Sequence, residues 1–414
     1  MIEQATDKKF RFIPYRKRDI VEMCLQDDLL PGQEENFRNL YHMLDSIFHF
    51  EFHQIIESLK DTYAPIDPDS DTRQYENTEH LADLNFVDLL GNLLEKANYE
   101  RVTEADLNQA LNESSLFKIR LHVDFDVFAE VLLFCRGEST RQETVSSWRG
   151  LVSKSIEFTN YERVVVYIRF RDDYKHPKEQ LPSCRPGATL LKLFQNVPKA
   201  DLEMLFPNTL VRMRTIDKLL IGIPALFSGG IVLTTKLGAS LILLGSLLGF
   251  WLGFRRQPVE LDKTAFMALL AGLVALGGYL WKEFNKFKNR KLRFMQALTQ
   301  NLYFKNLDNN AGVFHCLAND AEEEECKEAI LAYYILQISE QPLSRTELDR
   351  KVENWMATKW NCAIDFEIDD ALEKLLALEL VQDSNGNLSA IPIEAGIQKL
   401  DQRWDDYFVP SCMQ

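Results

Sequence analysis

The sequence predicts an α+β membrane protein with a soluble domain at each end and a helical hydrophobic region between them. Three observations support this fold class. Apolar residues recur at helical spacing in both terminal parts, and β-branched and aromatic runs precede residue 170. Between residues 219 and 254 the chain carries a single charged side chain, Lys236. Each predicted element is justified below in chain order.

Length and charge limit the classes of function. A chain of 414 residues has room for two or three compact units. The formal net charge of −15 argues against a general nucleic-acid-binding protein, because such proteins carry an excess of basic residues. The seven cysteines are scattered and show no CxxC spacing, which favours reduced thiols over a disulfide framework or a zinc ribbon.

The first predicted domain, residues 1–217, begins with helices and continues with strands. A helical pattern covers residues 19–63 and returns in "LADLNFVDLLGNLLEKA". The runs "VFAEVLLFCRG" and "ERVVVYIRF" are typical of paired strands, and Gly137 is expected to end the first. This order predicts an α+β domain.

The predicted membrane region covers residues 218–282. It holds three segments without an ionisable residue, which are 219–235, 237–254 and 264–281. A membrane span needs about 20 apolar residues, with about 17 as the lower limit. Either two or three segments cross. The two-crossing alternative leaves almost all flanking Lys and Arg on one side, which the positive-inside rule would make the cytosolic side of both soluble parts.

Two further features adjoin these segments. Gly245, Gly249 and Gly253 recur every fourth residue, and such rows let helices approach closely, within the chain or between copies in a homo-oligomer. Residues 283–306 continue the helical period with many Lys and Arg, which predicts a basic helical stalk after the last segment.

The second predicted domain, residues 313–401, has the order of elements of a winged helix. Helical patterns cover 321–340, 344–358 and 367–380, and Asn385 with Gly386 is a hairpin signal. The third helix is acidic, so DNA phosphates would repel it. We therefore expect a protein partner rather than nucleic acid. The predicted contact residues are Glu367, Asp369, Asp370 and Glu373.

Two groups of residues have ligand types that bind metals, and both admit a simpler interpretation. His49 and His53 share a helix face, but the HExxH motif is missing. Asp67, Asp69 and Asp71 alternate like the start of a calcium loop, but the later EF-hand positions fail. We interpret the first group as ordinary helix histidines and the second as a turn. We therefore expect no metal and no cofactor, and no catalytic residue can be named.

Several phrases of the sequence resemble a known family. They include "KLFQNVPKADLEMLFPNT", "LTQNLYFKNLDNNAG" and "EEECKEAILAYYIL", and the similarity extends from about Phe12 to Asp401. They resemble the transmembrane protein 143 family, a set of uncharacterised membrane proteins with domain of unknown function 3754. The resemblance implies an integral membrane protein of a bacterial inner or thylakoid membrane, and it implies no activity.

Three hypotheses follow for the function. The first is a membrane-anchored scaffold or protein-interaction module, whose partners are the lipid bilayer and another protein. The second is a membrane-bound metal-dependent enzyme that uses the His49/His53 and Asp67–Asp71 regions. The third is a transport component assembled through the glycine row. The absence of charge within the segments argues against the third, and the failed motifs argue against the second.

Overall fold

The computed structural model of the chain describes most of its residues, and they cluster into two compact units. The described ranges are 9–69, 85–103, 120–147, 152–173, 186–207, 210–212, 245–246, 248–252 and 263–407. The first unit comprises the described residues within Met1–Ser114, Phe125–Leu202 and Lys305–Gln414, and the second those within Ser115–Asp124 and Glu203–Phe304.

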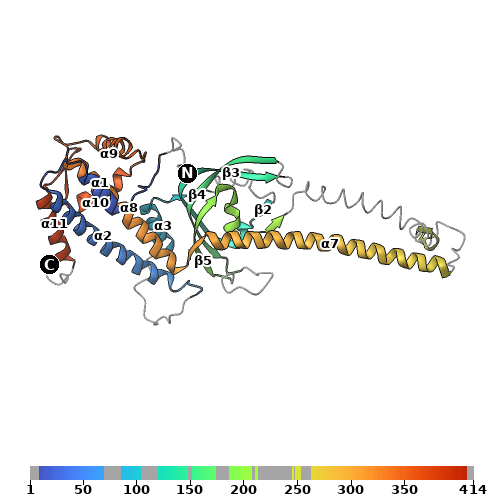
Figure 1. Cartoon of the computed structure of the whole chain (residues 1–414). Coiled ribbons are helices and arrows are strands. Elements are labelled where there is room, and N and C mark those ends of the chain that lie inside the picture. The colour runs from blue at the N-terminus through green and yellow to red at the C-terminus, as the bar shows by residue number, and fades with distance from the viewer. Residues whose placement is uncertain are drawn as a thin grey trace. The chain divides into compact units, whose positions relative to one another are not determined.

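A long buried helix, α8 (Ala311–Gln337), forms the centre of the first unit. Figure 1 shows it among the helices of both chain ends, and α1, α2, α3, α9 and α10 all contact it. It is buried around its whole circumference from Ala329 to Leu336, as expected for a helix enclosed by other elements. The surrounding helices are α1 (Lys17–Leu25), α2 (Glu34–Tyr63), α3 (Phe86–Lys96), α9 (Arg345–Trp360), α10 (Ile368–Ala377) and α11 (Ile393–Asp406).

The sheet of the first unit has five strands in the order β1-β3-β4-β5-β7, and all neighbouring pairs are antiparallel. Two rows of side chains run across its centre: Phe134, Val165 and Leu193 lie in register, and so do Leu132, Tyr167 and Leu191. All six belong to the same hydrophobic core as the helices. The strands are β1 (Glu100–Arg101), β3 (Phe128–Ser147), β4 (Val152–Phe170), β5 (Thr189–Pro198) and β7 (Asn306–Asn309).

The hairpin of β3 and β4 is longer than the sequence predicts. Gly137 was expected to end the first strand, but pairing continues to Ser147 opposite Val152. Gly137 has a φ of +71°, and a Cβ at this position would lie 2.9 Å from the Cβ of Glu162. The glycine is therefore a local distortion within a continuous strand and does not end it.

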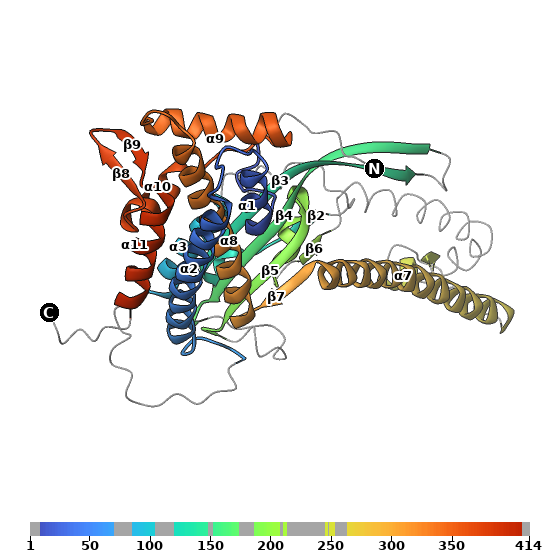
Figure 2. The same ribbon diagram turned by 60° about the vertical axis from the view of Figure 1, so that its left-hand side comes forward.

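The C-terminal elements follow the expected order. After α8, α9 and α10 comes a hairpin of β8 (Val381–Ser384) and β9 (Asn387–Ala390), and Leu343 pairs with Leu388 of β9. Asn385 and Gly386 both have positive φ, as a tight two-residue hairpin turn requires. The winged-helix assignment and the boundaries 313–401 stay predictions. Helix α11, which the sequence interpretation omitted, packs against α2 in Figure 2.

The second unit contains a short strand pair and a long helix. Strands β2 (Arg120–His122) and β6 (Leu210–Arg212) are antiparallel. Helix α7 runs without interruption from Lys263 to Lys305, so the residues predicted as a stalk form its second half. The described secondary structure also includes short 3-10 turns, η2 (Phe125–Val127) and η4 (Lys199–Leu205), and helical residues at 245–246 and 248–251.

The prediction of an integral membrane protein is wrong. Within the described ranges, no helix is both long and apolar enough to span a membrane. Residues 219–235 lie outside the described residues, as does most of 237–254. The third predicted segment, 264–281, belongs to α7, which continues through Lys282 and Lys286. This charge-free window is close to the lower limit of about 17 residues for a span, and the charged remainder of the same helix follows it directly. The membrane anchor, the bilayer as partner and the inner or thylakoid membrane location are withdrawn with it.

Candidate functional site: a buried ion-pair network beside an acidic face

The most unusual local sequence in the first unit is "DAEEEECKE", residues 320–328 of α8. Most of its side chains are charged, yet Glu324, Glu325, Lys327 and Glu328 are each only 3% exposed. Removing an unpaired charge from water costs several kcal/mol, so each buried charge needs a partner. The packing of α8 between other elements supplies those partners from distant parts of the chain.

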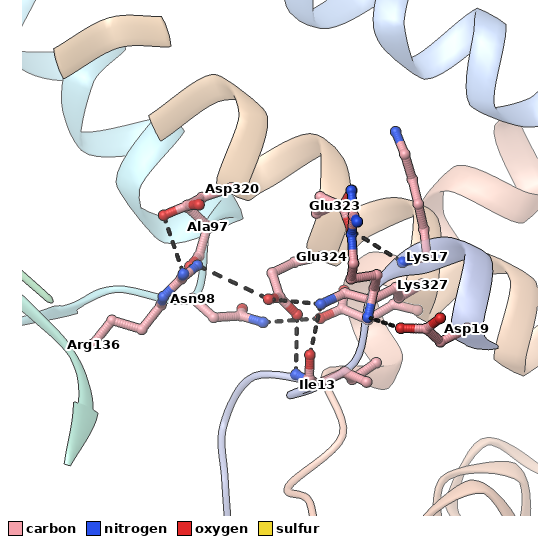
Figure 3. Close-up of polar contacts among 12 residues, drawn as sticks. Ile13, Lys17, Asp19, Ala97, Asn98, Arg136, Asp320, Glu323, Glu324 and Lys327 are labelled. Atoms are coloured by element: carbon pink, nitrogen blue, oxygen red, sulfur yellow. Dashed lines mark hydrogen bonds and ion pairs between the residues drawn. The ribbon is translucent and has the colours of Figure 1, made fainter. Parts of the chain in front are cut away.

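The first set of partners comes from the N-terminal segment and from β3 (Figure 3). Glu324 accepts a hydrogen bond from the Ile13 amide at 3.1 Å and pairs with Lys327 at 3.0 Å. Lys327 in turn donates to the Ile13 carbonyl at 2.7 Å. A buried acid and a buried base, one helical turn apart, thus hold both backbone groups of one residue. This arrangement fixes Ile13, which is 3% exposed, against α8.

Arg136 of β3 contacts two of the carboxylates of α8, those of Asp320 and Glu324. Its guanidinium lies 3.1 Å from Asp320 and donates to the carbonyl of Ala97 at 3.1 Å. The aromatic rings of Phe12 and Tyr99 lie 5.3 and 5.0 Å from it. An arginine is suited to this site because its planar group can stack on rings while its edge donates hydrogen bonds.

A second set of ion pairs links α8 to α1, α2, α3 and α10. Glu322 pairs with Lys17 at 2.6 Å, and Lys17 also contacts Asp45 at 2.5 Å. Burial lowers the pKa of Lys17, but the carboxylates of Glu322 and Asp45 outweigh that effect, so the pKa is raised overall. Glu325 lies between Lys96, at 2.7 Å, and Lys374, at 3.2 Å.

Glu328 differs from its neighbours because its described partner is neutral. The side chain amide of Asn98 donates to it at 2.9 Å. Burial raises the pKa of Glu328 well above its ordinary value, and the nearby carboxylates of Glu324, Asp370 and Glu325 raise it further. Taken together, the ion pairs of this network attach α8 to the neighbouring helices and to β3. We assign the network no catalytic role.

The acidic residues of α9, α10 and the segment between them form a second feature, which we call the acidic face. Asp369 and Glu373 are exposed on α10, while Ala371, Leu372 and Leu375 of the same helix are buried. The α10 sequence therefore places its apolar residues on the core side and acids on the solvent side. The acidic face consists of Asp349, Glu353, Asp365, Glu367, Asp369, Asp370 and Glu373.

The carboxylates of the acidic face repel one another. Partial burial raises the pKa of Asp349, and the carboxylates of Glu353, Asp365 and Asp369 raise it further, while Lys9 lowers it. Burial and the neighbouring carboxylates of Glu325, Glu367 and Glu373 raise the pKa of Asp370, against a lowering effect of Lys96. The negative charge is therefore dense enough to favour cations from solution or from another molecule.

The candidate metal ligands do not converge in the part of the chain that the structure describes. There, no group of three or more His, Cys, Asp or Glu side chains could hold a metal ion. His49 is 76% exposed, and its Nδ1 lies 3.0 Å from Glu322. His53 is exposed on the same helix.

The described part of the predicted calcium loop is a turn. Asp67 accepts a hydrogen bond from the Asp69 amide, and Asp69 accepts one from the side chain of Asn310 at 2.6 Å. Asn310 immediately precedes α8, so Asp69 attaches this turn to the start of the central helix. Asp71 lies outside the described residues.

The glycine row and the acidic contact residues have different outcomes. Gly245 and Gly249 have no atom within 4 Å of an added Cβ, among described neighbours, and Gly253 lies outside the described residues. Their role in helix packing stays a prediction. Of the predicted contact residues, Asp369 and Glu373 are exposed, Asp370 is half-buried, and Glu367 binds Arg11 at 2.6 Å.

Sequence reasoning missed the N-terminal basic segment and Arg136 as partners of α8. A usable signal was present in the pair of oppositely charged runs, "KKFRFIPYRKR" and "DAEEEECKE". The pairing itself joins residues about 300 positions apart, such as Lys17 and Glu322.

Comparison with known proteins gives one family match. Residues 161–312 match the model of a family described as a protein of unknown function (DUF3754). The match covers part of β4, all of β5, α7 and β7, and the first residues of α8. This supports the expected domain of unknown function over a shorter range than Phe12–Asp401, and it does not show the transmembrane protein 143 family. No solved structure matches the chain.

Proposed function

We propose that this protein is a protein-interaction module whose acidic face binds a basic segment of a partner protein. The observation that supports this proposal is the density of carboxylates on α10 and α9, where Glu373 is exposed and Asp369 is exposed but paired with Arg345 of α9. A partner carrying Lys or Arg would relieve the repulsion between carboxylates, which adds to the larger effect of burial in raising the pKa of Asp349 and Asp370. The same carboxylates would repel nucleic-acid phosphates, so nucleic acid is a poor candidate.

A peptide titration tests the charge requirement. The probe is a fluorescent hexalysine peptide, and binding to the full chain is followed by anisotropy at increasing salt. Asp369→Lys with Glu373→Lys should weaken binding about tenfold or more, because two attractive charges become repulsive. Asp401→Lys with Asp405→Lys is the matched control, since these acids are exposed on α11 and do not belong to the acidic face. Equal weakening in both variants would reduce the effect to net charge and would contradict the proposal.

A crosslinking experiment tests the natural partner. Leu376 is 39% exposed on α10, so a photo-crosslinking residue there reports on whatever contacts this helix. In native extract, the crosslinked protein should carry its attachment site within a Lys- or Arg-rich segment. The crosslink should disappear with Asp369→Lys and Glu373→Lys. A crosslink that persists in this variant, or that maps to an acidic or apolar segment, would refute the proposed mode of binding.

A further inference from the structure

The N-terminal residues Lys9–Ile13 lie against the acidic face and make one isolated parallel β-bridge there. The amide of Phe10 donates to the carbonyl of Ala363 at 3.0 Å, and the amide of Asp365 donates to the carbonyl of Phe10 at 2.7 Å. These two bonds form a parallel bridge between Phe10 and Ile364. The Asp365 amide and the Ala363 carbonyl, just before α10, can therefore pair with the backbone of an extended chain. The protein's own N-terminal segment makes this pairing in the structure.

The charges on this segment match the acids around it. Lys9 contacts both carboxylate oxygens of Glu353 at 2.8 Å. Arg11 pairs with Glu367 at 2.6 Å and with Glu100 at 3.0 Å. In an extended chain, residues i and i+2 lie on the same side, so Lys9 and Arg11 face the acids together. Phe10 and Phe12 lie on the other side, with their rings 5.7 Å apart.

The attachment weakens toward the N-terminus. Ile13 is buried and held through both backbone groups by Glu324 and Lys327. In contrast, the side chains of Lys9 and Arg11 are 52% and 49% exposed. Exposed ion pairs contribute little to stability because water and salt screen them. The outer residues can therefore detach while Ile13 and the network beneath it stay in place.

We propose that the strand edge at Ala363–Asp365, flanked by Glu353 and Glu367, is a docking site for an extended basic segment of a partner protein, and that Lys9–Phe12 is its internal competitor. The site recognises two basic residues separated by one residue, together with a free backbone N–H and C=O. The proposal rests on the proposed function, because it specifies how the basic partner would bind. It adds that the chain regulates access to its own acidic face.

The test compares the full chain with the variant Lys9→Ala/Arg11→Ala. The probe is a fluorescent peptide of residues 7–14, "DKKFRFIP", and the control peptide carries Glu at each Lys and Arg position. An internal ligand competes at an effective concentration near the millimolar range. Weakening it should therefore tighten binding of the basic peptide about tenfold, and the control peptide should not bind.

Two further measurements separate the possible outcomes. In the double alanine variant, hydrogen exchange at the Asp365 amide should accelerate, and circular dichroism should be unchanged. Adding Glu353→Gln and Glu367→Gln should abolish peptide binding. Faster exchange at Asp365 without tighter peptide binding would overturn the docking site, as would binding that survives the glutamine substitutions.

The peptide titration does not depend on Asp369 and Glu373, which test the proposed function separately. Peptide binding at Ala363–Asp365 without any crosslink from Leu376 would leave the docking site in place and refute the part of the proposed function that assigns the partner contact to Asp369 and Glu373 of α10. The reverse result would support a basic partner that binds on α10 alone and would overturn the competition proposed for Lys9–Phe12.

Discussion

Individual residues of the network on α8 have different electrostatic roles although they are neighbours in sequence. Glu324, next to Lys327, and Glu325, between Lys96 and Lys374, have buried or half-buried cations as partners. Glu328 instead accepts a hydrogen bond from an amide and has a raised pKa. This difference gives the residue a distinct signature in the dependence of stability on pH.

We expect Glu328→Gln to stabilise the protein at neutral pH. The folded-state pKa of Glu328 is raised above the ordinary 4.5, so the folded state holds this proton more tightly than the unfolded state does. Wild-type stability therefore falls as pH rises from about 4.5 toward the folded-state pKa. Glutamine removes this loss and keeps an acceptor for Asn98. The difference in urea unfolding free energy between variant and wild type should vanish near pH 4 and grow toward pH 8.

Glu373→Gln is the control for this experiment, since Glu373 is exposed on α10. It should change neither the stability nor its dependence on pH by more than about 0.5 kcal/mol. A Glu328→Gln variant that loses stability uniformly at all pH values would show that the carboxylate is ionised in the folded protein.

Arg136 gives a second prediction at the residue scale. Arg136→Met should cost about 3–5 kcal/mol, because it leaves Asp320 and Glu324 without this cation in a buried site. Arg136→Lys keeps the charge but loses the planar contact with Phe12 and Tyr99, so its cost should be smaller. Urea unfolding measures both variants. An equal cost for the two would mean that the rings and not the charge stabilise this site.

At the scale of single elements, glycines distinguish a strained strand from a regular helix. Gly137 has positive φ within β3 and no room for a Cβ beside Glu162, whereas Gly91 lies in α3 with no atom within 4 Å of an added Cβ. Gly137→Ala should therefore destabilise the protein by about 1 kcal/mol or more. Gly91→Ala should stabilise it by about 0.5–1 kcal/mol, since alanine is the better helix former.

Thermal unfolding of the two alanine variants checks this pair, with wild type measured in parallel. Opposite shifts in melting temperature are expected. A stabilising Gly137→Ala would contradict the positive φ assigned to this position.

Elements with local signals were predictable from sequence, and those defined by distant contacts were not. The apolar stripe Phe37, Leu40, Leu44 and Ile47 predicts α2, and all four side chains are buried. Asn385-Gly386 likewise predicts the hairpin of β8 and β9, because the turn chemistry lies within the motif.

The candidate site was predictable only in part. The acids of α10 were recognisable because they share one helix, and Asp369 and Glu373 are indeed exposed. The burial of Glu322, Glu324 and Glu325 in α8 was not recognisable, because the cations that pair with them from other elements, Lys17, Lys96, Arg136 and Lys374, lie on four separate segments of the chain. The membrane prediction failed although the basic continuation of α7 was recognised, because the charge-free stretch of this helix was taken to be sufficient for a span.

At the scale of the whole molecule, the longer of the two segments that form the second unit is inserted between two paired strands of the first. Strands β5 and β7 are antiparallel neighbours, with Lys192 opposite Asn309, and residues 203–304 lie between them in sequence. Such a pair needs only a short connection. The first unit should therefore not require the inserted residues for its own fold.

We expect the chain to keep its first unit when residues 203–304 are replaced by a Gly/Ser linker of about ten residues. The pairing of Asn98 with Glu328 and of Ile13 with Glu324 should persist, and slow hydrogen exchange at the Ile13 amide would report it. In contrast, residues 313–401 alone should not fold, because they lack the α1, α2 and α3 faces that cover α8. A folded, monomeric 313–401 fragment would contradict the single core described for the first unit.

The position of α8 in the sequence also sets an order of events during synthesis. Helices α1, α2 and α3 and strands β3 to β5 leave the ribosome before residue 311, while their shared central helix is still untranslated. At ~5–20 residues per second, the delay between the end of β5 and the end of α8 is on the order of ten seconds. During that time the apolar side chains that α8 covers in the folded protein lack this partner. The nascent chain is therefore a natural client for chaperones, and a chain truncated before α8 should be degraded rather than accumulate.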